Sequence, residues 1–247
     1  MRYFLDISYN GSNYHGWQRQ ANAHTVQEEI EYSLSKILGE EIAITGSGRT
    51  DTGVHAKKQI AHFDTLSSLS IDQIQYKLNG ILPPDISINE AYGVIDEAHA
   101  RFDAVQRGYH YYIHQKKNPF LEGLSYFYSH KLNIDLMNET ASKLLGEQDF
   151  ESFSRVKTEV NNFNCEIYSA NWVWENDQLV FNVRANRFLR GMVRALVGTL
   201  LEVGKGKLTP NDFVDIINAK NRTKAGRAVP PHGLYLTEVN YPEHIYR

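Results

Sequence analysis

The order of two apolar periodicities along the first hundred residues constrains the fold of this chain more than any other feature. Residues 2–9 alternate between apolar and polar side chains, which is typical of a half-buried strand. From Val26 to Leu38 the apolar residues recur every three or four positions, which predicts a helix, and Thr25 and Glu28 have the spacing of a capping box. The pattern continues with strands at 42–45 and 59–63, a helix at 71–79 and a strand at 86–95. This βαββαβ order is that of the ferredoxin-like split unit.

The second half of the chain repeats this order loosely. A strand at 109–114 and a helix at 136–145 precede a hairpin of strands 167–174 and 179–184, which turns at Asn176-Asp177. Helices are then predicted at 188–203 and 213–217, and a last strand at 233–240. We therefore predict an α+β protein of two ferredoxin-like halves with mostly antiparallel sheets, divided into residues 1–104 and 105–247.

Composition excludes several classes of protein. No run of 18 or more apolar residues occurs, and the N-terminus alternates instead of forming an apolar block, so neither a membrane span nor a signal peptide is expected. The single cysteine, Cys165, has no partner for an internal disulfide, which favours a reducing cytoplasm, and its surroundings favour a structural thiol over a nucleophile. No HExxH or paired CxxC motif is present, so no metal site is expected. The net charge of −3 argues against binding nucleic acid by overall charge, but not against a local basic surface.

The segment from Gly46 to Ala56 carries the densest chemical signal. It reads GSGRTDTGVHA, and its three glycines indicate a sharply bent backbone or a close approach to a ligand. The dinucleotide fingerprint fails because the spacing of the glycines is wrong. A Walker A loop fails because Val54 and His55 stand where Lys and Ser or Thr are required.

What remains in this segment is an arginine and a carboxylate two residues apart. Arg49 could keep Asp51 ionised and oriented, as a carboxylate nucleophile requires. The alternative is a structural turn whose Arg–Asp pair is solvated and contributes little. The spacing alone gives the two interpretations about equal weight.

A resemblance favours the first interpretation. GSGRTDTGVHA resembles the signature of the TruA family of transfer RNA pseudouridine synthases, and five further blocks follow the family's order along nearly the whole chain. These blocks are YNGSNYHGWQ with TVQ from Tyr9, ARFDA with YHY from Ala100, GEQDFESF from Gly146, FLRGMVR from Phe188, and GLYL from Gly233. The departures are Thr52, where relatives more often have Ala, His110, where they often have a basic residue, and the segments 154–166 and 227–232. We expect these loops to influence which RNA positions are accepted.

The resemblance implies roles for individual residues. Asp51 would be the catalytic nucleophile, Arg49 an RNA contact beside it, Tyr109 the platform on which the flipped base stacks, and Arg194 the salt-bridge partner of the catalytic Asp. Without the family, Tyr109 reads more simply as a core tyrosine of a sheet.

Other matched residues are left more open. Arg187, Arg190 and Arg194 are predicted on one helix face, where like charges are costly unless they meet anions such as phosphates. The alternative for Arg187 and Arg190 is a solvated basic face. Phe102 and Trp17 are predicted to pack in the core, and Arg101 is left open between an RNA contact and a solvated side chain.

The family also implies the reaction and the partners. Uridine at positions 38, 39 and 40 of the anticodon arm would be isomerised without cofactor or metal, in an RNA-binding cleft between the two halves of the chain. The protein would be a homodimer, with one transfer RNA spanning both subunits. Two rivals stay open. One is a non-catalytic RNA-binding module of the same fold, and the other is a glycoside hydrolase, which needs a second acid that no motif supplies.

Overall fold

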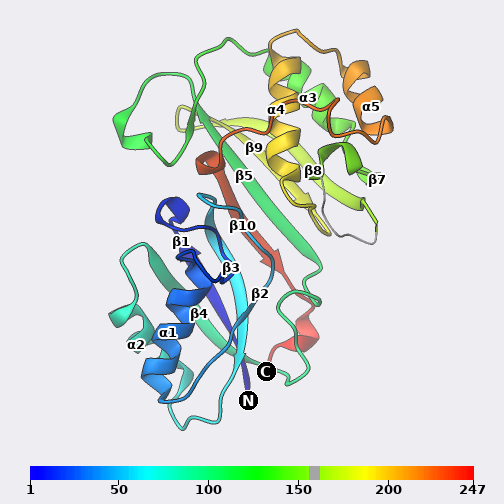
Figure 1. The fold of residues 1–247 in the computed structure, drawn as a ribbon. Helices are drawn as coiled ribbons and strands as arrows, with labels where there is room; N and C mark the ends of the chain where they lie inside the picture. Colours follow the sequence, from blue (N-terminus) through cyan, green and yellow to red (C-terminus); the bar gives the residue numbers. More distant parts are fainter. Residues whose placement is uncertain (156–161) are drawn as a thin grey trace. The chain divides into compact units, whose positions relative to one another are not determined.

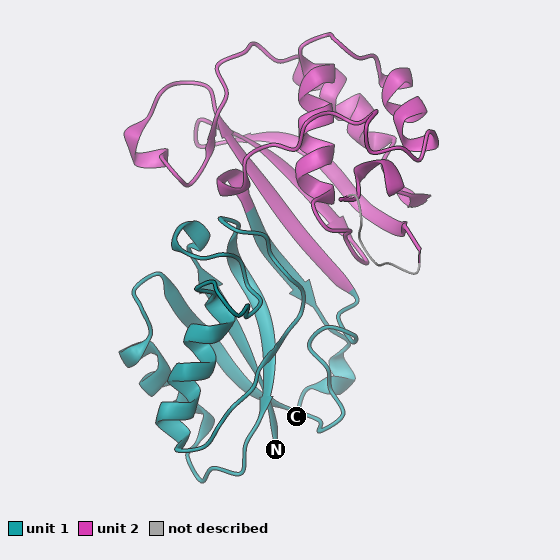
Figure 2. Ribbon diagram, in the orientation of Figure 1, with its two compact units in different colours: residues 1–105, 235–247 teal, residues 106–234 magenta. Residues whose placement is uncertain are grey.

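The chain folds into two compact units. The computed structural model describes residues 1–155 and 162–247, so part of the departing segment 154–166 lies outside the described residues. Residues 1–105 and 235–247 form unit 1, and residues 106–234 form unit 2 (Figure 2). The expected division after residue 104 thus lies one residue from the end of the first segment, but the structure assigns residues 235–247 to unit 1.

Unit 1 is an antiparallel sheet that one parallel strand extends. The strands β1 (Arg2–Tyr9), β3 (His55–Asp64) and β4 (Ile86–Val94) lie in the order β4-β1-β3 (Figure 1). The short β2 (Thr45–Gly46) pairs antiparallel with β3. The strand β10 (Leu234–Asn240) runs parallel to β3, with Tyr235 opposite His55. The βαββαβ order predicted for the first half is therefore present, and β10 joins it from far along the chain.

The strand predicted at 42–45 begins later than expected, because the observed strand β2 spans only Thr45–Gly46. The N–H group of Ile42 donates to the hydroxyl of Ser35, and that of Ile44 donates to the Glu31 carboxylate. Both acceptors belong to the helix α1 (Val26–Leu38). Because these backbone groups bond to a helix, pairing with β3 begins only at Thr45.

The two helices of unit 1 have the predicted positions and clear ends. At α1 the Thr25 hydroxyl accepts from the Glu28 N–H, and Gly39 ends the helix in the left-handed conformation, with φ of 70°. At α2 (Ile71–Ile81) the side chains of Ser70 and Gln73 form a reciprocal capping box. The helices pack on each other, and α2 also packs on β4.

A buried histidine lies beneath the loop that follows β4. His62 of β3 is 8% exposed, and its Nδ1 accepts the N–H of Ala100 at 3.1 Å. Its ring lies 4.7 Å from that of His99, and the Arg2 guanidinium is nearby. Burial, followed by the positive charges of Arg2 and His99, lowers the pKa of His62 to about 4.

This pKa predicts a loss of stability in mild acid. The unfolded chain takes up a proton at His62 below pH ~6.5, whereas the folded chain does so only near pH 4. The contribution of the neutral His62 to the free energy of unfolding is therefore complete above pH ~6.5 and falls by about 2 to 3 kcal/mol by pH ~4.5. We expect His62→Gln, which keeps an acceptor but does not titrate, to lose less unfolding free energy than the parent between pH 7 and pH 4.5. Urea denaturation at both values measures this, and equal losses in the two proteins would contradict it.

The described residues of unit 2 form a row of antiparallel strands and three helices. The strands β5 (Gln106–His114), β9 (Gln178–Ala185), β8 (Asn164–Glu175) and β7 (Gly146–Asp149) lie in the order β5-β9-β8-β7. The short β6 (Tyr126–Phe127) pairs parallel with β5. The predicted hairpin of β8 and β9 is confirmed, and its turn residues Asn176 and Asp177 both have positive φ.

The helices of unit 2 are α3 (Ile134–Ser142), α4 (Met192–Gly204) and α5 (Pro210–Asn218), and they contact one another. The described residues also form 3-10 turns at Gly11–Asn13, Pro119–Leu121, Glu151–Phe153, Pro231–Gly233 and Glu243–Ile245.

The prediction that α4 begins at residue 188 is wrong. The helix begins at Met192, because Gly191 precedes it in the left-handed conformation, with φ of 74°. Leu189 is buried in the irregular segment before the helix, so the apolar spacing continues there without helical backbone. Arg187 and Arg190 therefore lie outside α4, and the three arginines do not share one helix face.

The α+β class is confirmed. Ten strands and five α-helices occur in residues 1–155 and 162–247, and most strand pairs are antiparallel. No helix in these two ranges is long and apolar enough to cross a membrane.

Candidate active site

The segment that carries Asp51 is the loop between β2 and β3, and hydrogen bonds fix both of its sides. The Ser47 N–H donates to the Ile60 carbonyl at 2.7 Å, and the amide of the buried Gln59 donates to the Gly48 carbonyl at 2.9 Å. Nearer to Asp51, the hydroxyls of Thr50 and Tyr9 are 2.8 Å apart. The Asp51 carbonyl accepts the N–H of Val54 at 3.1 Å. The loop is thus anchored on both sides of the carboxylate.

Two glycines near the N-terminus, Gly11 and Gly16, allow their backbone to lie directly against the Asp51 loop. A Cβ on Gly11 would overlap the carbonyl oxygen of Val54, and a Cβ on Gly16 would overlap that of Thr50. Gly16 also has φ of 90°, a conformation that side chains other than glycine rarely adopt. The backbone N–H of Trp17 donates to the Thr50 carbonyl at 3.3 Å. These close approaches explain why glycine stands at both positions.

His55, at the start of β3, fixes the end of the loop. It is buried, and its Nδ1 accepts the N–H of Gly11 at 3.0 Å. Its ring stacks on Tyr235 of β10 with centroids 4.5 Å apart. The loop therefore depends on a strand that is distant in the sequence.

Asp51 itself is half-buried, and Arg49 is exposed. A half-buried carboxylate on an anchored loop can reach a substrate while its backbone stays in place, which a nucleophile needs. Both residues lie on the same loop, as the sequence predicts.

Tyr109 lies in unit 2, on β5 opposite Val183 of β9. It is half-buried, and its ring meets that of Phe188 edge to face at 5.1 Å. Its neighbour on the same strand face, Tyr111, is fully buried and donates its hydroxyl to the Pro230 carbonyl at 2.9 Å. Tyr111 therefore serves the core, while part of Tyr109 remains exposed.

Arg194 lies in the first turn of α4, where the helix dipole disfavours a cation. Its Nε donates to the Val229 carbonyl at 2.7 Å, and its own carbonyl accepts the Val229 N–H at 3.1 Å. The segment that contains Val229 can lie close to the helix because Gly198 has no side chain. A Cβ at Gly198 would overlap the carbonyl oxygen of Arg227. Two hydrogen bonds to one residue thus fix the backbone and the guanidinium of Arg194.

The other two arginines precede α4. Arg190 is exposed, whereas Arg187 is half-buried and donates to the side-chain oxygen of Asn162 at 3.4 Å. Arg187 also lies near Cys165, whose pKa burial raises to about 11. The Cys165 side chain is fully buried, so its thiol is protonated near neutral pH and suits a structural role.

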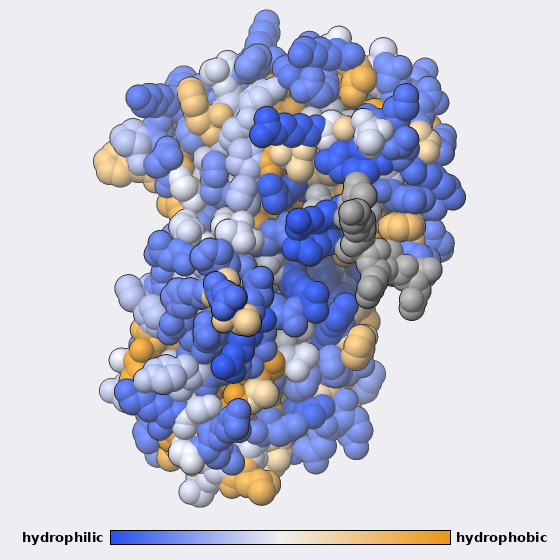
Figure 3. Space-filling model, viewed as in Figure 1, coloured by the Kyte–Doolittle hydropathy of each residue, from blue (hydrophilic) through white to orange (hydrophobic). Residues whose placement is uncertain are grey.

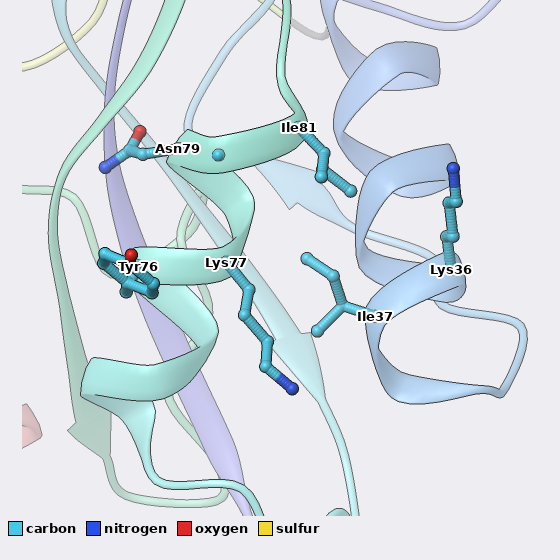
Figure 4. A pocket seen from close by; sticks show the side chains of 7 residues that line it. Lys36, Ile37, Tyr76, Lys77, Asn79 and Ile81 are labelled. Carbon is cyan, nitrogen blue, oxygen red and sulfur yellow. The ribbon is translucent and has the colours of Figure 1, made fainter.

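One pocket in the described part of the chain is remote from the Asp51 loop. It has a volume of about 580 Å³ and lies between the C-terminal parts of α1 and α2, lined by Lys36, Ile37, Tyr76 and Lys77 among others (Figure 4). The other end of α1 adjoins Gly16, and a 13-residue helix is roughly 20 Å long. The residues that line the pocket include no carboxylate or thiol, so the pocket does not supply the nucleophile. Within residues 1–155 and 162–247, no group of three metal-ligating side chains is placed to hold an ion.

Comparison with known proteins decides the family. A family model described as tRNA pseudouridine synthase matches residues 7–103 and 140–242. The chain belongs to this family. The "tRNA pseudouridine synthase A" of Parabacteroides distasonis is 48% identical over 246 residues, covering 99% of this chain and 98% of the relative. That of Bacillus subtilis is 41% identical, covering 98% and 99%. Among solved structures, a chain of a Cbf5-Nop10-Gar1 complex aligns with a TM-score of 0.38 at 12% identity, over 95% of this chain and 58% of that chain.

Membership of the tRNA pseudouridine synthase family confirms the resemblance found in the sequence. The supporting roles of Gly11, Gly16 and His55 were not predicted from the sequence, although all three lie in blocks matched to the family. The prediction that Trp17 packs in the core is confirmed, since Trp17 is 2% exposed. The same prediction was wrong for Phe102, which is 75% exposed.

Proposed function

We propose that this chain isomerises uridine to pseudouridine in transfer RNA, at positions 38, 39 and 40 of the anticodon arm, with Asp51 as the nucleophile. The family match and the names of the relatives support the reaction and the class of RNA. The observation that carries the role of Asp51 is its place on a loop that two glycines, Gly11 and Gly16, and the buried His55 hold in position. The choice of positions rests on the resemblance to the TruA family.

The reaction needs no net change in the atoms of the substrate. The bond between C1′ of the ribose and N1 of uracil breaks, the base rotates, and a bond between C1′ and C5 forms. The proton on C5 is released and N1 gains one, so neither an oxidant nor a cofactor is required. Asp51 would act at the sugar or at the base to assist departure of uracil, because a carboxylate can form a covalent intermediate with either.

The remaining residues would bind and position the RNA. Extrusion of a base costs a few kcal/mol, and the partly exposed ring of Tyr109 would offset this by stacking, which contributes about 1–3 kcal/mol. We assign Arg194 as the cation that pairs with Asp51, and its fixed guanidinium suits that role. We assign Arg49, Arg187 and Arg190 to RNA contacts. Cytoplasmic location and a homodimer complete the proposal.

Site-resolved mapping of pseudouridine in unmodified tRNA tests the proposed function. We expect product at positions 38 to 40 after incubation with the protein. A matched tRNA with cytidine at these positions should gain none there. Product elsewhere in the tRNA would refute the choice of positions, and absence of product in every tRNA tested would refute the reaction.

The same experiment separates the rivals. A non-catalytic RNA-binding module would bind the tRNA and leave every uridine unchanged. A glycoside hydrolase would release free uracil, which chromatography detects, and would leave an abasic site.

A further inference from the structure

The loop of residues 99–103, which follows β4 in unit 1, presents an exposed aromatic ring. The residue Phe102 is 75% exposed, although it was predicted to pack in the core. The Arg101 guanidinium lies over it, with its central carbon 5.7 Å from the ring centroid. The ring of His99 lies against Phe102 with centroids 4.2 Å apart. An exposed aromatic ring beside an arginine is a surface suited to a nucleotide, because it offers a stacking face and a cation for a phosphate.

The backbone of this 99–103 loop is held in place almost residue by residue. The Nδ1 of His99 accepts the N–H groups of Arg101 and Phe102, at 3.1 and 3.3 Å. The carboxylate of Asp103 accepts the N–H of His99 at 2.7 Å. The N–H and the carbonyl of Ala100 are bound by His62 and by the hydroxyl of Tyr241. The exposure of Phe102 is therefore a fixed feature of the fold and not the result of a loose loop.

Carboxylates as well as cations surround the loop: Asp64 pairs with Arg2 at 2.7 Å, and Glu97 is exposed. Asp103, the carboxylate within the loop, is turned to the backbone, and nearby Asp96 pairs with Arg247 at 2.8 Å. On the face of the molecule that Figure 3 shows, apolar residues are scattered among hydrophilic ones.

We propose that Phe102 and Arg101 form a nucleotide-binding element, in which a base of the substrate tRNA stacks on Phe102 and Arg101 contacts the adjoining phosphate. This inference rests on the proposed function, which supplies the RNA. It adds a contact in unit 1 outside the Asp51 loop. The element binds and positions the RNA, and it does not touch the reacting atoms.

Binding of unmodified tRNA to the full chain tests the inference. The measurement is made with Asp51→Asn present throughout, so that the RNA stays unchanged. We expect Phe102→Ala to weaken the Kd roughly 5- to 100-fold, Phe102→Leu to lose most of the same affinity, and Phe102→Tyr to keep it, because only the aromatic residues offer a stacking face. Arg101→Ala should also lower the slope of log K against log salt by about one phosphate contact. Tyr76→Ala, which removes an 83% exposed ring from α2, is the matched control and should bind like the parent.

Several results would overturn the inference. They are a Kd for Phe102→Ala equal to that of Tyr76→Ala, parent affinity in Phe102→Leu, or a change in oligomeric state without a change in RNA affinity, which would indicate a protein partner. Unfolding temperatures equal to that of the parent show that the variants fold. Failure of the proposed function is detected by a different measurement, the mapping of pseudouridine. It would appear as absence of pseudouridine after incubation with the parent protein.

Discussion

Replacement of Asp51 by asparagine is expected to lower pseudouridine formation by roughly 10³-fold or more, because asparagine keeps the shape of the side chain but is a far poorer nucleophile. The hydrogen bonds that hold the loop come from Ser47, Thr50 and the Asp51 carbonyl, so they survive the substitution. We therefore expect the unfolding free energy to change by about 1 kcal/mol or less, as is usual for a site that is not in the core. Single-turnover kinetics on unmodified tRNA give the rate, and filter binding gives the Kd.

A matched control removes a carboxylate elsewhere in unit 1. Asp96 is exposed and pairs with Arg247 on the surface, where such a pair contributes little to stability. Asp96→Asn should keep the parent rate in single-turnover kinetics. If Asp51→Asn retains more than a tenth of the parent rate, Asp51 is not the nucleophile, and a different group must carry the reaction.

Replacement of Gly16 by alanine is the second large effect that we expect. The left-handed backbone at Gly16 disfavours alanine by about 1 kcal/mol or more, and the new methyl group would overlap the Thr50 carbonyl oxygen, next to Asp51. Because a misplacement of about 1 Å can reduce the rate of a reaction by roughly 10²-fold, we expect turnover to fall on that scale. The measurements are the rate under saturating tRNA and the unfolding free energy.

Gly39→Ala separates strain from misplacement of the loop. Gly39 has φ of 70° but no atom within 4 Å of an added Cβ, so alanine there adds backbone strain without an overlap. It should lose stability to a similar extent and keep the parent rate. Equal loss of activity in both variants would show that reduced stability, and not displacement of the Asp51 loop, explains the effect at Gly16.

The fold followed from the sequence wherever local patterns decided the structure. The helices α1 and α2 and the strands β1 and β4 have the expected positions because their apolar periodicity is strong and their ends carry Thr25, Gly39 and Ser70. The start of α4 was misplaced because the buried Leu189 continues the apolar spacing before the helix. The left-handed Gly191, which starts the helix, has no clear signal in one sequence.

Features that depend on distant contacts could not be predicted in this way. The sequence gives no indication that the last strand pairs with β3, or that Ile42 and Ile44 bond to α1, because both depend on tertiary contacts. Phe102 was predicted to pack in the core, but it is exposed on a loop whose backbone is held by hydrogen bonds to the side chain of His99. The position of Asp51 was predictable, but the overlap that forbids a side chain at Gly16 was not.

The pairing of β10 with β3 has a consequence for synthesis of the protein. A chain emerging from the ribosome has made β1, β3 and β4 by residue 94, but the strand that covers the start of β3 is translated more than 130 residues later. Until then Tyr235 cannot stack on His55, and the turn that follows Asp51 lacks one of its supports. A nascent chain therefore completes the surroundings of its carboxylate only after Tyr235 has been translated. An incomplete chain would contain Asp51 without the stacking of Tyr235 on His55 that supports its loop.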